Sequence, residues 1–468
     1  MKEDTICAVS TAMSDAGVGI IRVSGEDAFT ITDKLFTDGA GRRRLLSYAS
    51  HTIHYGYIED PDTGERLDEV LVSVMRAPHS YTRENVAEIN CHGGRFVLQR
   101  MLELLIKNGC RMAEPGEFTK RAYLNGRIDL SEAHAVMDII SSENEFALKN
   151  ALKQLSGKLS EDIESIRQII LHESARIEAA LDDPDAYDLE GYPEQLRSVL
   201  NDLTKKLNDL VRSYDEGHIR RDGIDTVIIG MPNAGKSSLF NRLAGSDRAI
   251  VTEIPGTTRD LIEEKVRVGE LVLNITDTAG IRDTEDTVEK IGVERALSRA
   301  SDCALVLYVK DASDEDKEIL LPETSDDTRF IILINKTDLC SDCEGIEDHL
   351  KKRLSERGYG EDRFSIIRTS MLTGEGLGSV KDEICRLFLK GELVPREEYY
   401  LTDIRQKKAA EKAADSLELV KKSIDTGMSE ELYLRDLMDA YSALGSITGE
   451  QTDDDLADEI FSAFCMGK

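Results

Sequence analysis

A glycine-rich loop between an apolar run and a helix start limits what this chain can fold into more than any other feature. Residues 230–237 read Gly-Met-Pro-Asn-Ala-Gly-Lys-Ser and directly follow the apolar run 226–229. This order is typical of a phosphate-binding loop, because the glycines let backbone N–H groups close around phosphate oxygens. Lys236 would bring positive charge to the outer phosphates, and Ser237 would ligate a magnesium ion. The pattern predicts nucleotide binding through Asn233, Ala234, Gly235, Lys236, Ser237 and Ser238.

A second motif indicates which base is bound. Residues 335–338 (Asn-Lys-Thr-Asp) follow the apolar run 330–334, so we expect them at the end of a buried strand. The Asp338 carboxylate can accept hydrogen bonds from the amino and imino N–H groups of guanine, which adenine lacks. A site built for such bonds rejects the wrong base strongly. The motif therefore predicts guanine recognition through Asn335, Lys336, Thr337 and Asp338.

A third motif lies between the other two. Residues 277–280 (Asp-Thr-Ala-Gly) follow the predicted strand 271–275. There, Asp277 would hold magnesium through water, and the Gly280 N–H would meet the γ-phosphate. The loop 252–260 is expected to fold over that phosphate, with Thr258 as a second magnesium ligand. Each motif alone fits a simple turn at a strand end, but all three in this order predict a GTPase. Further expected GTP-binding residues are Thr252, Glu253, Ile254, Pro255, Gly256, Thr257, Thr258, Asp277, Thr278, Ala279 and Gly280.

Hydrolysis needs a water in line with the γ-phosphate and positive charge at the transition state. Many small GTPases orient that water with a glutamine, but this chain has Ile281 at the position. One candidate substitute is Glu289, acting through water, although a glutamate at a helix start is more often an ordinary surface residue. The other is a monovalent cation in a cage of oxygens, but Asn233 could equally do no more than shape the loop. The cage would use the Asn233 side chain and the backbone carbonyls of Thr252, Ile254 and Thr257.

The charge of the chain argues against a broad electrostatic contact with nucleic acid. Its 468 residues carry 59 basic and 90 acidic side chains, for a net charge of −31. Local basic clusters at 42–44, 220–221 and 405–408 are either partner-binding patches or solvated surface. There is no apolar run of membrane-spanning length and no basic-then-apolar leader, and the cysteines are scattered. We therefore expect a cytoplasmic protein with no membrane partner.

Hydrophobic patterning predicts a multidomain protein with α/β and all-α parts. Residues 1–125 read as an α+β domain, with a helix at 93–107 and strands at 6–9, 18–23, 52–58, 70–75 and 86–90. Residues 222–388 alternate strands and helices, as a doubly wound, Ras-like sheet requires. Its strands are expected at 225–229, 271–275, 303–309, 330–334 and 365–367.

The remaining segments, 126–221 and 389–468, repeat apolar residues at three- and four-residue steps, which is typical of helices. The simplest arrangement packs both into one discontinuous helical bundle, with the P-loop GTPase domain inserted between them. Such stripes could also form a coiled coil between two copies, but packing within one chain is the commoner use.

The three motifs and four further segments resemble one family over nearly the full length of the chain. The segments are 17–25 (Gly-Val-Gly-Ile-Ile-Arg-Val-Ser-Gly), 91–94 (Cys-His-Gly-Gly), 114–118 (Glu-Pro-Gly-Glu-Phe) and 461–468 (Phe-Ser-x-Phe-Cys-Met-Gly-Lys). The family is MnmE (also called TrmE), the tRNA-modifying GTPases of bacteria and organelles. The resemblance implies an N-terminal folate-binding domain that also forms a homodimer, a helical domain from both flanks, and the inserted GTPase domain.

The resemblance also implies a function. With an FAD-dependent partner, MnmG (GidA), the family adds an aminomethyl or carboxymethylaminomethyl group to carbon 5 of the wobble uridine (position 34) of certain tRNAs. A heterotetramer with that partner is expected. The implied cofactors are Mg²⁺, K⁺ and 5-formyltetrahydrofolate or a related reduced folate, with GTP as substrate. Potassium at Asn233, Thr252, Ile254 and Thr257 would drive pairing of the GTPase domains and hydrolysis.

Further site residues follow from the resemblance. Glu289 matches the catalytic glutamate, and Cys465 matches a C-terminal cysteine implicated in the modification. On the residues alone, Cys465 reads as a buried thiol at a helix end. The folate would be held by Arg22, Glu88, Arg127 and Lys468, and the guanine would be backed by Ser370, Met371 and Leu372. The chain departs from the family pattern at Arg127 (commonly lysine), Met371 (usually alanine) and Met466 (usually a branched aliphatic).

A GTP-dependent regulatory switch in ribosome assembly is the alternative function. It would use the same three GTPase motifs, but it gives no role to residues 1–125 or to Cys465. The sequence also lacks a clearly basic RNA-binding appendage. We therefore expect GTP hydrolysis coupled to tRNA modification.

Overall fold

The structure is a computed structural model, and it describes most of the chain. The described residues are 4–142, 144–186, 190–245, 264–269, 271–275, 303–313, 328–339, 343–356, 360, 363–388, 399–450, 460–462, 464 and 467. The chain divides into two compact units. Met1–Ser141, Ala151–Leu207 and Lys408–Lys468 form the first unit, and Ser142–Asn150 with Asn208–Lys407 form the second.

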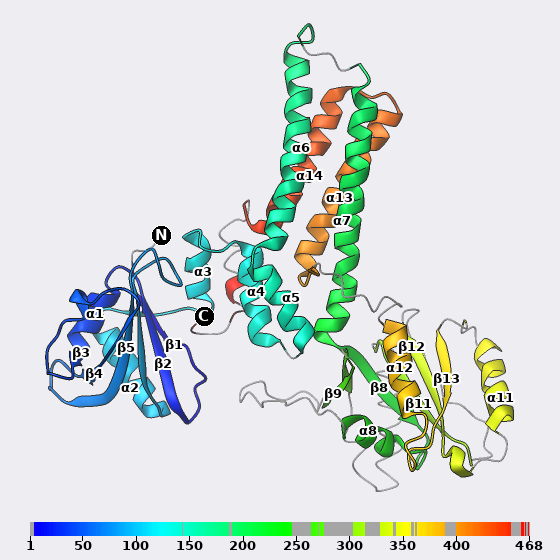
Figure 1. Ribbon diagram of the computed structural model, residues 1–468, viewed down its shortest axis with the longest axis horizontal. Helices are drawn as coiled ribbons and strands as arrows, with labels where there is room; N and C mark the ends of the chain where they lie inside the picture. Colours follow the sequence, from blue (N-terminus) through cyan, green and yellow to red (C-terminus); the bar gives the residue numbers. More distant parts are fainter. Residues whose placement is uncertain are drawn as a thin grey trace. The chain divides into compact units, whose positions relative to one another are not determined.

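A seven-stranded sheet dominates the N-terminal part of the first unit (Figure 1). The strands pair in the order β3-β4-β5-β6-β2-β1-β7, and every pairing is antiparallel except that of β1 with β7. The five predicted strands are confirmed, whereas β3 and β7 are too short to show a hydrophobic pattern. The strands are β1 Ile6–Val9, β2 Ala16–Ser24, β3 Phe36–Asp38, β4 Thr52–Glu59, β5 Arg66–Met75, β6 Val86–Gly93 and β7 Arg111–Met112.

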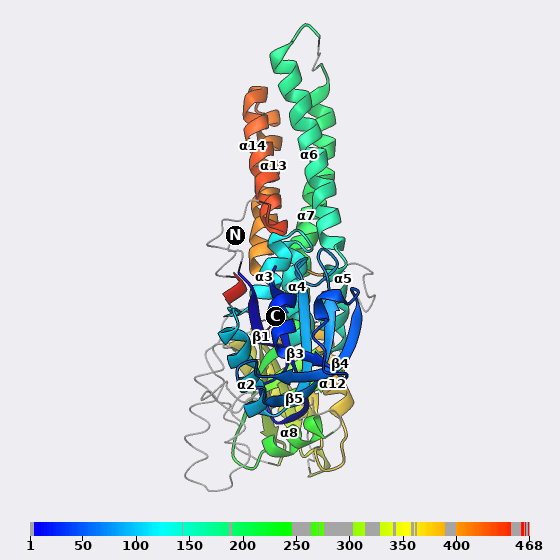
Figure 2. The ribbon, with the colours of Figure 1, turned by 90° about the vertical axis from the view of Figure 1, so that its left-hand side faces the viewer.

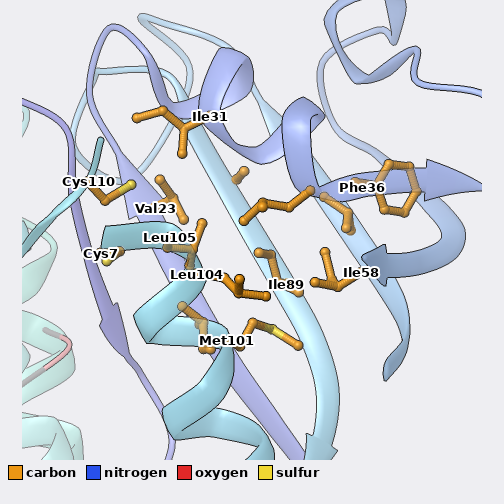
Figure 3. Packing of buried hydrophobic residues seen from close by; sticks show 14 of the residues in the cluster. Cys7, Val23, Ile31, Phe36, Ile58, Ile89, Met101, Leu104, Leu105 and Cys110 are labelled. Atoms are coloured by element: carbon orange, nitrogen blue, oxygen red, sulfur yellow. The ribbon is translucent and has the colours of Figure 1, made fainter. Parts of the chain in front are cut away.

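Helices α1 (Ala28–Leu35) and α2 (Arg95–Lys107) cover one face of this sheet. Figure 3 shows Met101, Leu104 and Leu105 of α2 directed toward the strand residues Val23 and Ile89. The predicted helix 93–107 is confirmed with a start at Arg95, whereas α1 was not predicted. The short helices η1 (Leu45–Ser47) and α3 (Glu117–Leu124) complete this part.

Helices from both flanks of the chain pack together in the first unit, as Figures 1 and 2 show for α6, α13 and α14. Arg167 of α6 stacks on the Tyr441 ring of α14 at 4.2 Å and pairs with Glu450 at 2.6 Å. Arg197 of α7 pairs with Asp425 of α13. The predicted discontinuous bundle is confirmed. The helices are α4 Leu130–Ser141, α5 Glu145–Leu155, α6 Lys158–Asp182, α7 Tyr192–Asp222, α13 Ile404–Asp425 and α14 Glu430–Thr448, of which α5, α7 and α13 have residues in both units.

The second unit contains a six-stranded sheet in the order β13-β12-β11-β8-β10-β9. All neighbours are parallel except β9 and β10, and the order reverses direction at β8, as in a doubly wound sheet. The five predicted strands are confirmed within one or two residues, and β9 was not predicted. The strands are β8 Ile224–Gly230, β9 Glu264–Val268, β10 Leu271–Ile275, β11 Leu305–Asp311, β12 Arg329–Asn335 and β13 Phe364–Arg368.

Described helices lie on both faces of this sheet. On one face, α8 (Lys236–Ala244) and α12 (Leu377–Phe388) pack into a common apolar cluster with β8, β10 and β11. On the other, α11 (Cys343–Glu356) contributes Leu350 and Leu354 to a second cluster. A short helix, η2 (Thr337–Leu339), follows β12. Within the described ranges, no helix combines the length and hydropathy that crossing a membrane would need.

Candidate functional site

The phosphate-loop glycines occupy backbone positions that exclude a side chain. Gly230 ends β8 at a φ of +154°, and a Cβ there would lie 2.3 Å from the Val309 carbonyl oxygen of β11. Gly235 precedes α8 at a φ of +108°, and a Cβ there would lie 2.2 Å from the Asn335 amide nitrogen. Asn233 has a φ of +60°, a conformation that asparagine tolerates better than most residues. The loop therefore has a conformation that its sequence is suited to adopt.

Lys236 lies across this loop. Its Nζ donates hydrogen bonds to the carbonyls of Gly230 and Met231, both at 3.0 Å. Ser237 follows in the first turn of α8, where backbone N–H groups lack helical partners and the helix dipole favours anions. The ammonium and the start of the helix thus provide the charge and the donors that a phosphate chain requires.

The buried Asn335 connects the phosphate loop to the loop after β13. Its amide nitrogen donates to the Ala234 carbonyl at 2.8 Å, and its amide oxygen accepts from the Met371 N–H at 3.0 Å. β12 positions this side chain, because it ends at Asn335 next to β11 in the centre of the sheet. One residue therefore ties two of the predicted motifs together.

The other residues of the guanine motif are also held by neighbours. The Ser370 hydroxyl donates to Asp338 Oδ1 at 2.6 Å, and the Thr337 hydroxyl donates to the Thr369 carbonyl at 3.1 Å. These bonds place the Asp338 carboxylate beside the 370–372 loop, which the resemblance assigns to the guanine. The loop is itself anchored to α8, because Arg242 donates to the carbonyls of Met371 and Leu372.

Lys336 has a φ of +63°, and its ammonium pairs with Asp311 Oδ2 at 2.6 Å. Partial burial raises the pKa of Asp311. The hydrogen bonds from Lys336 and Ser313 together lower it by more, so the net shift of the pKa is downward. The Asp311 carboxylate therefore stays ionised at neutral pH and holds Lys336 at the edge of the site.

Several predicted residues lie outside the described residues. They are Thr252, Glu253, Ile254, Pro255, Gly256, Thr257, Thr258, Asp277, Thr278, Ala279, Gly280, Glu289, Cys465 and Lys468. Ser238 is described, in the first turn of α8. The structure thus brings together the phosphate loop, the guanine motif and the 370–372 loop.

A second candidate site is formed by arginines in the first unit. Arg22 of β2 donates through Nε to Glu88 Oε1 of β6 at 2.9 Å, in agreement with their pairing across the two strands. Its guanidinium carbon lies 5.0 Å from the centre of the Tyr81 ring and 5.4 Å from that of Phe118. Arg22 Nη1 is buried, and among the described residues it has no hydrogen-bond partner. A buried, unpaired donor is costly, so this atom is suited to a ligand that accepts a hydrogen bond.

Arg127 lies against the same tyrosine. Its guanidinium carbon is 4.7 Å from the Tyr81 ring centre, and its Nη1 donates to the Tyr81 carbonyl at 3.1 Å. The Ser10 hydroxyl, just after β1, donates to the Gly467 carbonyl at 3.1 Å, so the chain end is held at the N-terminal sheet. The structure therefore brings Arg22, Glu88 and Arg127 into the same domain as the residue that precedes Lys468.

Sequence reasoning missed Tyr81, Asp311 and Arg242. Tyr81 and Arg242 carry no motif, and their partners are distant in sequence. Asp311 had a usable signal, since it is the polar residue at the carboxyl end of a buried parallel strand, where ligands bind in such sheets.

Comparison with known proteins agrees with this geometry. The family model of the MnmE helical domain matches residues 130–465, and that of the GTP-binding protein TrmE N-terminus matches residues 5–127. The tRNA modification GTPase MnmE of Lachnoclostridium phytofermentans is 47% identical over 472 residues, covering 100% of both chains. That of Acetivibrio thermocellus is 47% identical over 473 residues, also covering 100% of both. That of Streptococcus pyogenes is 44% identical over 472 residues, covering 99% of this chain and 98% of the relative. This chain belongs to the MnmE family of tRNA modification GTPases.

Proposed function

We propose that this protein couples potassium-stimulated GTP hydrolysis to modification of carbon 5 of the wobble uridine of certain tRNAs, in the cytoplasm, together with the FAD-dependent MnmG. The division into residues 1–125, 126–221, 222–388 and 389–468 is part of this proposal. The observation that carries its GTP-binding part is the bridge of Asn335 between Ala234 and Met371, whereas tRNA modification rests on membership of the MnmE family. The bridge joins a phosphate-binding loop to a guanine-binding loop, which is the arrangement that GTP requires.

The described side chains have distinct roles in GTP binding. Asp338 would accept hydrogen bonds from guanine while Ser370 keeps its carboxylate in place. Lys236, at its position over the loop, would neutralise the outer phosphates. The donor set also fits magnesium, which prefers oxygen ligands, because the Ser237 hydroxyl lies in the first turn of α8. When bound, magnesium neutralises charge on the phosphate oxygens; we assign Ser237 and Thr258 to it.

Potassium is assigned to Asn233, Thr252, Ile254 and Thr257, and the water-positioning role to Glu289. Of these residues, the structure describes Asn233, whose φ of +60° places its backbone in the left-handed region within the phosphate loop. A side-chain oxygen from this loop would face the phosphate chain, where added positive charge stabilises the transition state.

The potassium assignment predicts the effect of one substitution. Changing Asn233→Gly preserves the positive φ but removes the side-chain oxygen. Hydrolysis by the wild type should be about tenfold faster in K⁺ than in Na⁺, and the variant should lose this difference while binding GTP normally. Phosphate release measured in matched KCl and NaCl buffers tests this. If the variant keeps its preference for K⁺, Asn233 only shapes the loop.

The second site fits a reduced folate held by Arg22, Glu88, Arg127 and Lys468. Arg22 Nη1 offers a buried donor without a described partner, and Glu88 offers an acceptor next to it. A folate carries both N–H donors and carboxylate acceptors, so it complements this pair. The bond from Ser10 to Gly467 places the described residue before Lys468 at the same sheet. When bound, the folate supplies a one-carbon unit, and Cys465 is proposed to act next to it.

The exposed part of the N-terminal sheet at β4 and β5 supports a homodimer. Helices α1 and α2 cover one face, whereas Ile53, Tyr55 and Leu71 on the opposite face are 66%, 47% and 47% exposed. An apolar sheet face of this kind marks an interaction surface. We propose that a second copy covers it, and that MnmG binds the dimer as a heterotetramer.

Nucleoside analysis tests the whole function. In tRNA from cells that lack the gene, the carbon-5 substituent of wobble uridine should disappear, and wild-type protein should restore it. A Lys236→Ala variant should not restore it, because the outer phosphates lose their positive charge. Mass spectrometry of digested tRNA gives the measurement. Unchanged wobble uridines in the deletion strain would refute the proposed modification but leave the GTPase assignment intact.

A further inference from the structure

Two arginine guanidiniums in the N-terminal domain share one aromatic ring. The Arg22 guanidinium carbon lies 5.0 Å and that of Arg127 lies 4.7 Å from the centre of the Tyr81 ring. We propose that Tyr81 is a positioning residue, whose ring gathers both guanidiniums around an oxygen-rich anionic group of the bound ligand. This inference rests on the proposed folate site and adds a residue to it.

The surroundings of Tyr81 make its ring a rigid support. Its hydroxyl shares a hydrogen bond with the buried Thr119 hydroxyl at 2.9 Å, and it packs against the apolar cluster that includes Phe118. The loop directly after Tyr81 is also fixed. The Asn125 side chain donates to the Thr82 carbonyl at 2.7 Å, and Arg83 donates to the Asn125 carbonyl at 2.9 Å. A ring held in this way can hold the arginines before the ligand arrives, which reduces the cost of binding.

The charges around the ring favour an anion. Glu88 pairs with Arg22 at 2.9 Å, whereas the described part of the chain gives Arg127 no carboxylate within ion-pairing distance, only the more distant charge of Glu132. Counting only the groups in direct contact, the two guanidiniums and the Glu88 carboxylate carry a net charge of about +1 at neutral pH. Because like charges against one ring repel each other, an anionic ligand would relieve the repulsion and fill the unpaired hydrogen-bonding position of Arg22 Nη1.

Binding of 5-formyltetrahydrofolate to the full-length protein tests the role of Tyr81. Tyr81→Phe keeps the ring and should bind within about twofold of the wild type, whereas Tyr81→Leu should bind about tenfold more weakly. Isothermal titration calorimetry gives the Kd values. Hydrogen exchange in peptides of the N-terminal sheet shows whether that domain remains folded in each variant. The matched control is Tyr214→Leu in the second unit, which removes a ring from beneath Lys407 at 5.0 Å and should leave folate binding unchanged.

A double-mutant cycle separates positioning from a general structural effect. If Tyr81 acts by holding Arg127, the loss caused by Arg127→Gln should be smaller in the Tyr81→Leu background than in the wild type. Fully additive losses, or a Tyr81→Leu variant with wild-type affinity, would overturn the inference. If the wild type itself does not bind the folate, the proposed site fails, and this inference fails with it. The three results are distinguishable in one set of titrations.

Discussion

Replacing Asp338 by asparagine is expected to raise the Kd for GTP by about 10²–10⁴-fold. Two hydrogen bonds from guanine to the carboxylate would be weakened or lost, and each such bond to a charged group contributes about 1.5–3 kcal/mol. The introduced amide also presents an N–H group toward the N–H groups of the base. Xanthine carries a carbonyl where guanine carries its amino group, so xanthosine triphosphate should gain affinity as GTP loses it. Competition against a fluorescent nucleotide measures both Kd values.

The structure indicates that this substitution leaves the site folded. The Ser370 hydroxyl donates to Asp338 Oδ1 at 2.6 Å, and an amide oxygen can accept the same bond. Asp348→Asn, at an exposed position on α11, makes the same chemical change away from the site and should leave both affinities unchanged. Retention of tight GTP binding by the Asp338→Asn variant would show that another residue reads the base.

The second unit could be predicted well from the sequence because its chemistry is local. The phosphate loop is one continuous segment between a buried strand and a helix, and the pattern contains all three parts. Parallel strands are buried on both faces, so they appear as continuous apolar runs that are easy to recognise. Edge strand β9 was missed, although its Glu-Lys-Val-Arg-Val alternation is a recognisable strand signal.

The arginine site could be predicted only in part. Arg22, Glu88 and Arg127 came from a family resemblance, and no local pattern connects them with Tyr81. Tyr81 lies in a loop between β5 and β6, where side-chain direction follows no period. Its contacts depend on how the sheet brings β2 and the segment after α3 together, which is a property of the complete fold. A single sequence contains no direct signal for such a contact.

Replacing Arg121 by methionine is expected to destabilise the N-terminal domain by about 3–5 kcal/mol. The Arg121 side chain is 11% exposed and contacts three acidic residues. Its Nη2 donates to Asp4 Oδ1 at 2.8 Å and to Glu117 Oε1 at 3.0 Å, and its Nη1 donates to Glu84 Oε1 at 3.1 Å. Removing the guanidinium would leave these carboxylates close together with one cation fewer. Loss of one partner from a largely buried ion pair is costly because the remaining charge is no longer compensated.

Hydrogen exchange followed by mass spectrometry measures this loss within the full-length protein, through peptides that cover β1 and α3. Arg100→Met is the matched control, because Arg100 pairs with Glu103 on the surface of α2 and is 43% exposed. Exposed pairs of this kind contribute about 0–1 kcal/mol, so exchange in the control should change little. Equal protection in the two variants would mean that the Arg121 cluster does not stabilise the domain.

The same cluster should make the stability of the domain depend on acid pH. Burial raises the pKa of Glu117. Hydrogen bonds from Arg111, the Glu114 N–H and Arg121 together lower it by more, so the pKa in the folded state is below its ordinary value. Arg111 and Arg121 likewise lower the pKa of Asp4 against the effect of burial. Because both carboxyls bind protons more weakly in the folded state, their stabilisation is complete above their unfolded pKa values of about 3.9–4.3. It is lost as the pH falls through the lower folded values. In the Arg121→Met variant the carboxyls have lost this cation. Between neutral pH and about pH 3, this variant should therefore lose less protection from hydrogen exchange than the wild type does.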